Sequence, residues 1–169
     1  MAERIEFDDE ILRHIDAAYN LARWLVRDPA DADDVVQESY VRALKYKSGF
    51  GGTNLRAWLL SIVRNTCYTH LSKHHGWTEF DELAHGGSYD AAEADSITRI
   101  DAERLKMLLF ELPAEYREIL VLREFEDLSY REISEVADIP VGTVMSRIAR
   151  ARKRLRTAAA EYMEARTTQ

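Results

Sequence analysis

Apolar residues recur at helical spacing along most of the chain, and no stretch alternates apolar and polar residues as a half-buried strand does. The first apolar stripe covers residues 11–26, with Asp8 as the expected cap at the start of its helix. Further helices are expected over residues 29–46, with Asp28 as the cap and Pro29 as the first residue, and over 55–73. The pattern therefore predicts an all-α protein.

Two breaks interrupt this spacing. Residues 47–54 hold three glycines and are expected to form a loop. Residues 76–96 combine glycines with many acids and few regular apolar positions, which is typical of a linker. We therefore expect two small helical domains, residues 1–75 and 97–169, joined by a flexible acidic linker over 76–96.

The stretch 128–156 has the pattern of a helix-turn-helix. Ser129 and Glu132 have the spacing of a capping box, and Pro140 suits the first turn of the second helix. An apolar stripe on that helix should pack inward, formed by Val144, Ile148, Ala151 and Leu155. The opposite face carries the candidate DNA contacts, namely Thr143, Ser146, Arg147, Arg150, Lys153 and Arg154.

Charge is distributed unevenly along the chain. The formal net charge is −7, yet residues 143–156 hold six lysines and arginines and no acid. The local field decides affinity for DNA, so we expect an acidic protein that binds DNA weakly alone and needs a partner. The alternative is that this basic stretch is an ordinary solvated helix face.

The helix over 55–73 mixes an aromatic, a cation and an amide on one segment, through Trp58, Arg64 and Asn65. This mixture suits unpaired DNA, because bases stack on rings and phosphates bind arginine. The alternative is a tryptophan in the core with arginines in solvent. Phe50 in the neighbouring loop either anchors that loop or contacts a base.

The helix over 29–46 presents an exposed acidic and amide face that includes Asp34, Gln37, Glu38 and Val41. Such a face is a plausible protein-docking surface, and it is equally compatible with an ordinary capped surface helix.

Several classes of protein are disfavoured. Cys67 is the only cysteine, so an internal disulfide is excluded and a reducing compartment is favoured. Cys67, His70 and His74 share one helix face, but no second pair of ligands accompanies them, and we expect no metal and no other cofactor. No apolar run approaches a membrane span and no signal peptide is evident, so a cytoplasmic protein is expected. Phosphate-cradling loops and nucleophile elbows are also missing, which argues against an enzyme.

Two long stretches resemble a known family. DPADADDVVQESYVRALKY followed by LRAWLLSIVRNTCYTHLSK resembles the second conserved region of bacterial extracytoplasmic-function sigma factors, and LPAEYREILVLREFEDLSYREISEVADIPVGTVMSRIARARKRLR resembles their fourth region. The resemblance implies a dissociable subunit of RNA polymerase that recognises promoters, helps to open them and is not an enzyme. It implies core RNA polymerase, through its beta-prime and beta subunits, and promoter DNA as partners, and an anti-sigma factor as a regulator.

The resemblance also implies roles for individual residues. The polymerase-docking helix would use Asp31, Asp34, Val35, Gln37, Glu38 and Val41. The loop over 48–54, with Phe50 and Asn54, would capture a flipped base of the minus-10 element, supported by Trp58, Arg64 and Asn65. The helix-turn-helix would read the minus-35 element. Two other functions stay open: a stand-alone helix-turn-helix regulator, and a protein that sequesters another factor.

Overall fold

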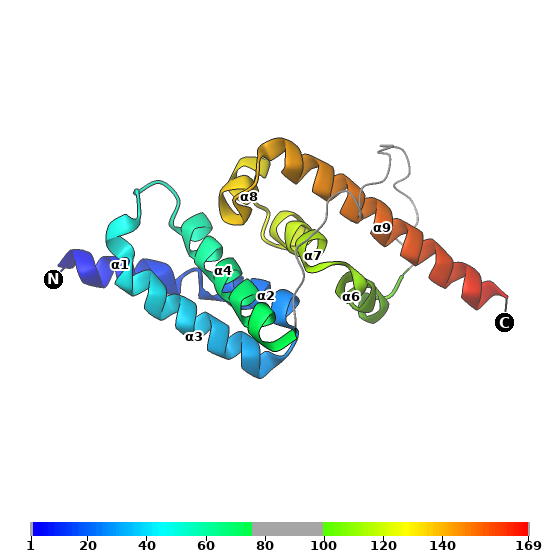
Figure 1. Ribbon diagram of the computed structural model, residues 1–169, viewed down its shortest axis with the longest axis horizontal. Coiled ribbons are helices and arrows are strands. Elements are labelled where there is room, and N and C mark those ends of the chain that lie inside the picture. The colour runs from blue at the N-terminus through cyan, green and yellow to red at the C-terminus, as the bar shows by residue number, and fades with distance from the viewer. Residues whose placement is uncertain (1, 76–99, 169) are drawn as a thin grey trace.

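A computed structural model describes residues 2–75 and 100–168, and every regular element in these ranges is a helix (Figure 1). The all-α prediction is therefore confirmed for the described residues. The predicted acidic linker over 76–96 lies outside them. Among the described helices, none combines the length and hydropathy that a membrane crossing requires.

The first module contains four α-helices: α1 (Ala2–Leu12), α2 (Ile15–Val26), α3 (Pro29–Lys45) and α4 (Leu55–His75). The expectation of one helix capped by Asp8 is wrong, because α1 runs through Asp8 and a break at residues 13–14 separates it from α2. The apolar spacing continues across this break, so periodicity alone cannot locate it. The Asp28 side chain accepts hydrogen bonds from two backbone amides and caps α3, as predicted.

The second module contains α6 (Ala102–Glu111), α7 (Ala114–Leu120), a π-helical turn η3 (Val121–Phe125), α8 (Tyr130–Ala137) and α9 (Val141–Thr167). The Ser129 hydroxyl accepts from the Glu132 amide at 3.1 Å, and the Ser129 amide donates to the Glu132 carboxylate at 2.7 Å. The predicted capping box is therefore confirmed. The inward stripe of α9 is confirmed as well, because Val144, Ile148, Ala151 and Leu155 are all buried.

The two modules pack directly on each other, a feature that the sequence pattern did not predict. Helix α8 lies against α4, and α7 lies against α2 (Figure 1). One apolar cluster joins Leu60 and Val63 of the first module to Ile119, Leu122 and Ile133 of the second. The face of α4 that meets the second module is thus part of a continuous core.

Candidate nucleic-acid interface

The basic face of α9 is only partly open to solvent. Lys153 and Arg154 are exposed, while Thr143, Ser146 and Arg150 are half-buried. Arg147 is 8% exposed, and its positive charge acts on the buried Glu118 carboxyl of α7. The candidate minus-35 residues therefore divide into an accessible group and one arginine that faces the protein interior.

Two further cations of α9 contact side chains of their own module. The Arg152 guanidinium forms an ion pair with Glu124, and the Arg154 guanidinium lies 5.5 Å from the centre of the Tyr116 ring. The two contacts hold long cationic side chains of α9 against their own module, one through a carboxylate of η3 and the other through a ring of α7.

The aromatic loop residue Phe50 packs beneath its loop. Its ring centre lies 5.4 Å from that of Trp58 and 6.1 Å from that of Phe7 on α1. In this structure the Phe50 ring anchors the loop, and its contact with a base stays a prediction. The loop itself contains one 3₁₀ turn (Lys47–Gly49) and a left-handed glycine, Gly52, at φ 87°.

A hollow of about 290 Å³ opens beside this loop, between α3 and α4. Trp58 and Asn65 both line it, so the structure brings two of the candidate minus-10 residues together. The other lining residues were not singled out from the sequence, namely Arg42, Tyr46, Gly49 and Ile62. They come from the end of α3, the following turn and α4. The helical spacing of apolar residues does not indicate that these segments lie side by side.

Arg64 of α4 is not directed into solvent. Its Nε and Nη2 atoms donate to Glu118 of α7 at 2.8 and 3.1 Å, and its guanidinium lies 4.5 Å from the centre of the Tyr68 ring. Burial lowers the pKa of Arg64, but the Glu118 charge and hydrogen bonds outweigh it and leave the pKa above its ordinary value. The alternative of arginines in solvent is therefore wrong for Arg64.

Glu118 is fully buried at the centre of this contact. Burial raises the pKa of its carboxyl, and the charge and hydrogen bonds of Arg64 oppose that shift. Desolvation therefore disfavours the charged form of both partners, and their mutual attraction opposes it. Nothing in the sequence distinguished this glutamate from the acids around it, because its role depends on a partner 54 residues away.

The remaining candidate of the minus-10 group is Asn54. Its side chain caps α4 and also contacts the second module. Its carbonyl oxygen accepts from the Ala57 amide at 3.0 Å, and its amide nitrogen donates to Glu132 at 2.8 Å. Arg56 makes a parallel contact, with Nη2 2.7 Å from the Glu126 carboxylate. Polar groups near the start of α4 are thus engaged by carboxylates of the second module.

The candidate docking helix α3 presents Asp34, Gln37 and Glu38 at the surface, with Val41 62% exposed. Asp31 is half-buried and lies 3.3 Å from His70 of α4. Val35 is 2% exposed and belongs to the core. A direct contact between Val35 and a partner is therefore wrong for this arrangement, because its side chain fills the space beneath the exposed face.

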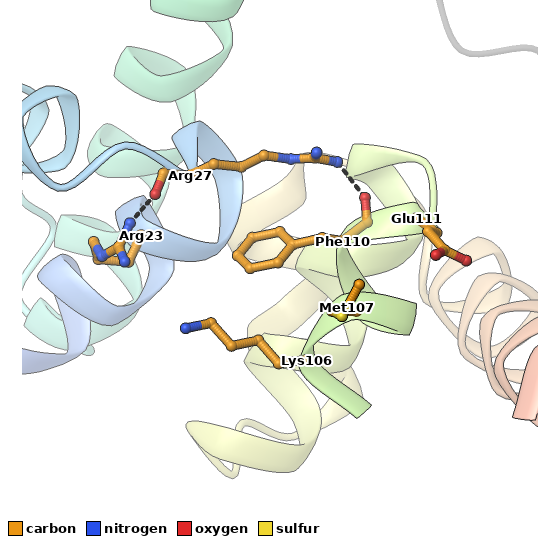
Figure 2. A pocket seen from close by; sticks show the side chains of 6 residues that line it. All are labelled: Arg23, Arg27, Lys106, Met107, Phe110 and Glu111. Carbon is orange, nitrogen blue, oxygen red and sulfur yellow. Dashed lines mark hydrogen bonds between the residues drawn. The ribbon is translucent and has the colours of Figure 1, made fainter. Parts of the chain in front are cut away.

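A groove of about 590 Å³ runs along the junction of the modules, between the end of α2 and α6 (Figure 2). The Arg27 guanidinium reaches across it and hydrogen-bonds to the Phe110 carbonyl. The side chains lining the groove are Arg23, Arg27, Lys106, Met107, Phe110 and Glu111. Cations from both modules thus surround an apolar floor, which exists only while the modules are packed together.

Within the ranges 2–75 and 100–168, no cluster of histidine, cysteine, aspartate and glutamate has the arrangement of a metal site. Cys67 is buried, and burial raises the pKa of its thiol well above the ordinary value. The rings of His70 and His74 lie with their centres 4.4 Å apart and their planes tilted by 38°. Cys67 is therefore an inert core residue in this structure.

Two known protein families match this chain, one over each of its two modules. The sigma-70 region 2 family matches residues 11–78, and the sigma-70 region 4 family matches residues 102–155. These matches define the class of protein, the sigma factors of bacterial RNA polymerase.

Individual relatives narrow the class. The chain is 33% identical over 160 residues to the RNA polymerase sigma-H factor of Pseudomonas aeruginosa, covering 87% of this chain and 82% of that protein. It is 33% identical to the ECF RNA polymerase sigma-E factor of Haemophilus influenzae, covering 79% and 76%. It is also 30% identical to the ECF sigma factor SigE of Mycolicibacterium smegmatis, where it spans 92% of this chain and 62% of that protein.

Solved structures give the same result. The sigma factor RpoE of Bartonella quintana, in complex with the anti-sigma factor NepR, aligns with a TM-score of 0.69 at 28% identity, covering 90% of this chain and 95% of that one. CnrH in complex with the cytosolic domain of CnrY aligns with a TM-score of 0.66 at 28% identity, covering 94% and 88%. The chain belongs to the extracytoplasmic-function sigma factors, alternative sigma factors that direct transcription initiation.

Proposed function

We propose that this chain binds core RNA polymerase in the bacterial cytoplasm, directs it to promoters with a minus-35 and a minus-10 element, and assists DNA opening without itself being an enzyme. The observation that carries the proposal is the order of two family-matched modules, one with an exposed acidic helix and a loop-bordered hollow, the other with a basic helix-turn-helix. Two weak readers on one chain gain affinity through effective concentration once polymerase holds both.

In this proposal α9 reads the minus-35 element in the major groove. Thr143, Ser146 and Arg150 lie near its start, where short side chains and a guanidinium reach base edges. Lys153 and Arg154 are exposed further along and suit phosphate contacts. Arg147 joins them only if it leaves its place beside Glu118.

The first module would hold the melted minus-10 strand. Asn65 is exposed at the rim of the hollow, and Trp58 offers a ring on which a base can stack. Docking on the beta-prime subunit would use the exposed members of α3, and Val35 would support that surface from within. The volume of the hollow exceeds that of one nucleobase.

One experiment on the reconstituted holoenzyme tests both modules, with DNase I protection upstream and permanganate reactivity of thymines downstream. Arg150→Ala should cost about 1–3 kcal/mol of promoter discrimination if the guanidinium reads a base, and Lys153→Ala should weaken binding uniformly. Asn65→Ala should reduce thymine reactivity at minus-10 while upstream protection remains. Ser72→Ala, an exposed change elsewhere on α4, serves as the control. Unchanged upstream protection in Arg150→Ala would remove Arg150 from the proposal, and unchanged thymine reactivity in Asn65→Ala would remove Asn65.

A regulatory partner also belongs to the proposal. One structural neighbour is a complex with a protein named as an anti-sigma factor, and another is a complex with the cytosolic domain of CnrY. The groove in Figure 2 supports such a partner here, because its lining comes from both modules. A protein that filled it would hold the modules together.

A stand-alone regulator is the alternative function. It would protect a symmetric operator without polymerase, because dimeric helix-turn-helix proteins bind paired half-sites. The footprint of the chain without polymerase distinguishes the two.

A further inference from the structure

Two exposed apolar side chains lie at the start of the basic helix α9. Val141 is 41% exposed and Met145 is 53% exposed, whereas Val144 and Ile148 at the same end are buried. Residues four apart share one face of a helix, so Val141 and Met145 form a single apolar strip on the surface. In Figure 1 this end of α9 lies at the upper edge of the molecule, beside α8.

This part of the helix carries no charge. Residues 141–146 include no lysine, arginine or acid, while residues 147–156 hold six lysines and arginines. In helix-turn-helix proteins the first residues of the second helix contact base edges, and cations contact phosphates. The apolar strip therefore lies at the end of α9 that is suited to bases.

The major groove offers an apolar side chain one kind of apolar partner. Base edges there present hydrogen-bond donors, acceptors and the methyl group of thymine, and the other three bases lack this methyl group. Contact with it removes apolar surface from water, which stabilises the complex. The unbranched thioether of methionine adapts its shape to such a surface. Met145 is thus chemically suited to thymine.

The neighbouring Ser146 extends this match to a whole base pair. Its hydroxyl donates to the Thr143 carbonyl at 3.1 Å, so its proton is engaged within the helix and its oxygen is left as an acceptor. In the major groove adenine presents an amino donor, and the paired thymine presents its methyl group. An acceptor beside an apolar side chain therefore fits an A·T pair, whereas a G·C pair has no methyl group to offer.

We propose that Met145 is a specificity-determining residue of the minus-35 contact, which packs on a thymine methyl group while Ser146 accepts from the adenine of the same base pair. Val141 widens the apolar strip on the same face. The inference rests on the proposed function, because it takes α9 as the reader of the minus-35 element. The cations of α9 then supply affinity, and Met145 supplies a preference for thymine.

Deoxyuridine tests the contact directly, because it pairs with adenine as thymine does and lacks only the methyl group. The reconstituted holoenzyme is bound to promoter duplexes in which each thymine of the mapped minus-35 element, on either strand, is replaced in turn. At one thymine the replacement should weaken binding about fourfold, which is the effect of exposing one buried methyl group. Competition binding at a fixed salt concentration measures the ratio.

Three variants show which side chain senses the methyl group. Met145→Ala should bind the thymine and uracil duplexes equally, and Met145→Leu, which keeps an apolar side chain of similar size, should retain the difference. Met107→Ala is the matched control, because Met107 is 54% exposed on α6, outside the helix-turn-helix. It should keep the whole fourfold difference.

Loss of discrimination in Met145→Ala, with the difference retained in the other two variants, supports the proposal. A minus-35 element without thymine, equal binding of all duplexes by the unchanged holoenzyme, or a fourfold difference that persists in Met145→Ala would overturn it. Absence of upstream protection by the unchanged holoenzyme would instead overturn the proposed function.

Discussion

At the scale of single residues, arginines of this chain differ in their surroundings and therefore in their roles. Arg64 and Arg147 both lie near the buried Glu118, whereas Arg150 on the next turn of α9 is half-buried at the surface. A guanidinium near a buried carboxylate supports the fold, because its removal leaves an uncompensated charge. Arginines of the helix-turn-helix therefore cannot be treated as equivalent DNA contacts.

This difference predicts how two single variants behave. Arg150→Ala should lower the free energy of unfolding by less than about 1 kcal/mol, because the side chain is half-buried and lies outside the core. Arg147→Ala should lower it by more than 1 kcal/mol, since Glu118 loses a neighbouring positive charge. Urea unfolding followed by circular dichroism measures both. Equal losses would contradict the separation of roles.

Cys67 gives a prediction about pH. Its thiol has a raised pKa in the folded chain, chiefly because it is buried, whereas in the unfolded chain it ionises near pH 8.5. Unfolding therefore releases a proton above that pH, and the free energy of unfolding should fall by up to about 1.4 kcal/mol per pH unit. The Tyr68 pKa is also raised, but that effect begins only above about pH 10.

The measurement compares urea unfolding of the unchanged chain and of Cys67→Ala at several values between pH 8 and 10. The variant should lose the thiol's contribution to the slope, whatever its stability at neutral pH. Parallel curves for the two proteins would show that Cys67 ionises equally in both states.

At the scale of elements, local chemistry determined most of what could be predicted. The Asp28 cap, the Ser129 capping box and the apolar stripe of α9 depend on residues within a few turns of one another, and all three are confirmed. The break between α1 and α2 was missed because apolar spacing runs through it. The partners of Arg64 and Asn54 were also missed, since they depend on how distant helices pack.

The capping box supplies a prediction at this scale. Ser129→Ala should lower the free energy of unfolding by about 1 kcal/mol, because an orphan amide at the start of α8 loses its acceptor. The loss is measured from the urea concentration at the midpoint of unfolding, provided that the slope of the free energy against urea concentration is unchanged. Ser72→Ala, exposed on α4, should have no comparable effect. A loss as large in the control as in Ser129→Ala would remove the capping box as the cause.

At the scale of the whole molecule, charge and packing fit a protein that acts only within a larger assembly. The chain carries a formal charge of −7 while its basic residues concentrate on α9. Carboxylates of the second module also bind Arg64 and Asn54 of the first. Isolated, such a chain should bind DNA weakly, because its overall charge repels the phosphate backbone.

The central claim is that this chain gives core RNA polymerase its choice of promoter. Run-off transcription of a genomic library by purified core polymerase, with and without the chain, tests it most directly. We predict new start sites that appear only with the chain and share two elements at a fixed spacing upstream. Identical transcripts in the two reactions, or protection of a symmetric site by the chain alone, would contradict the claim.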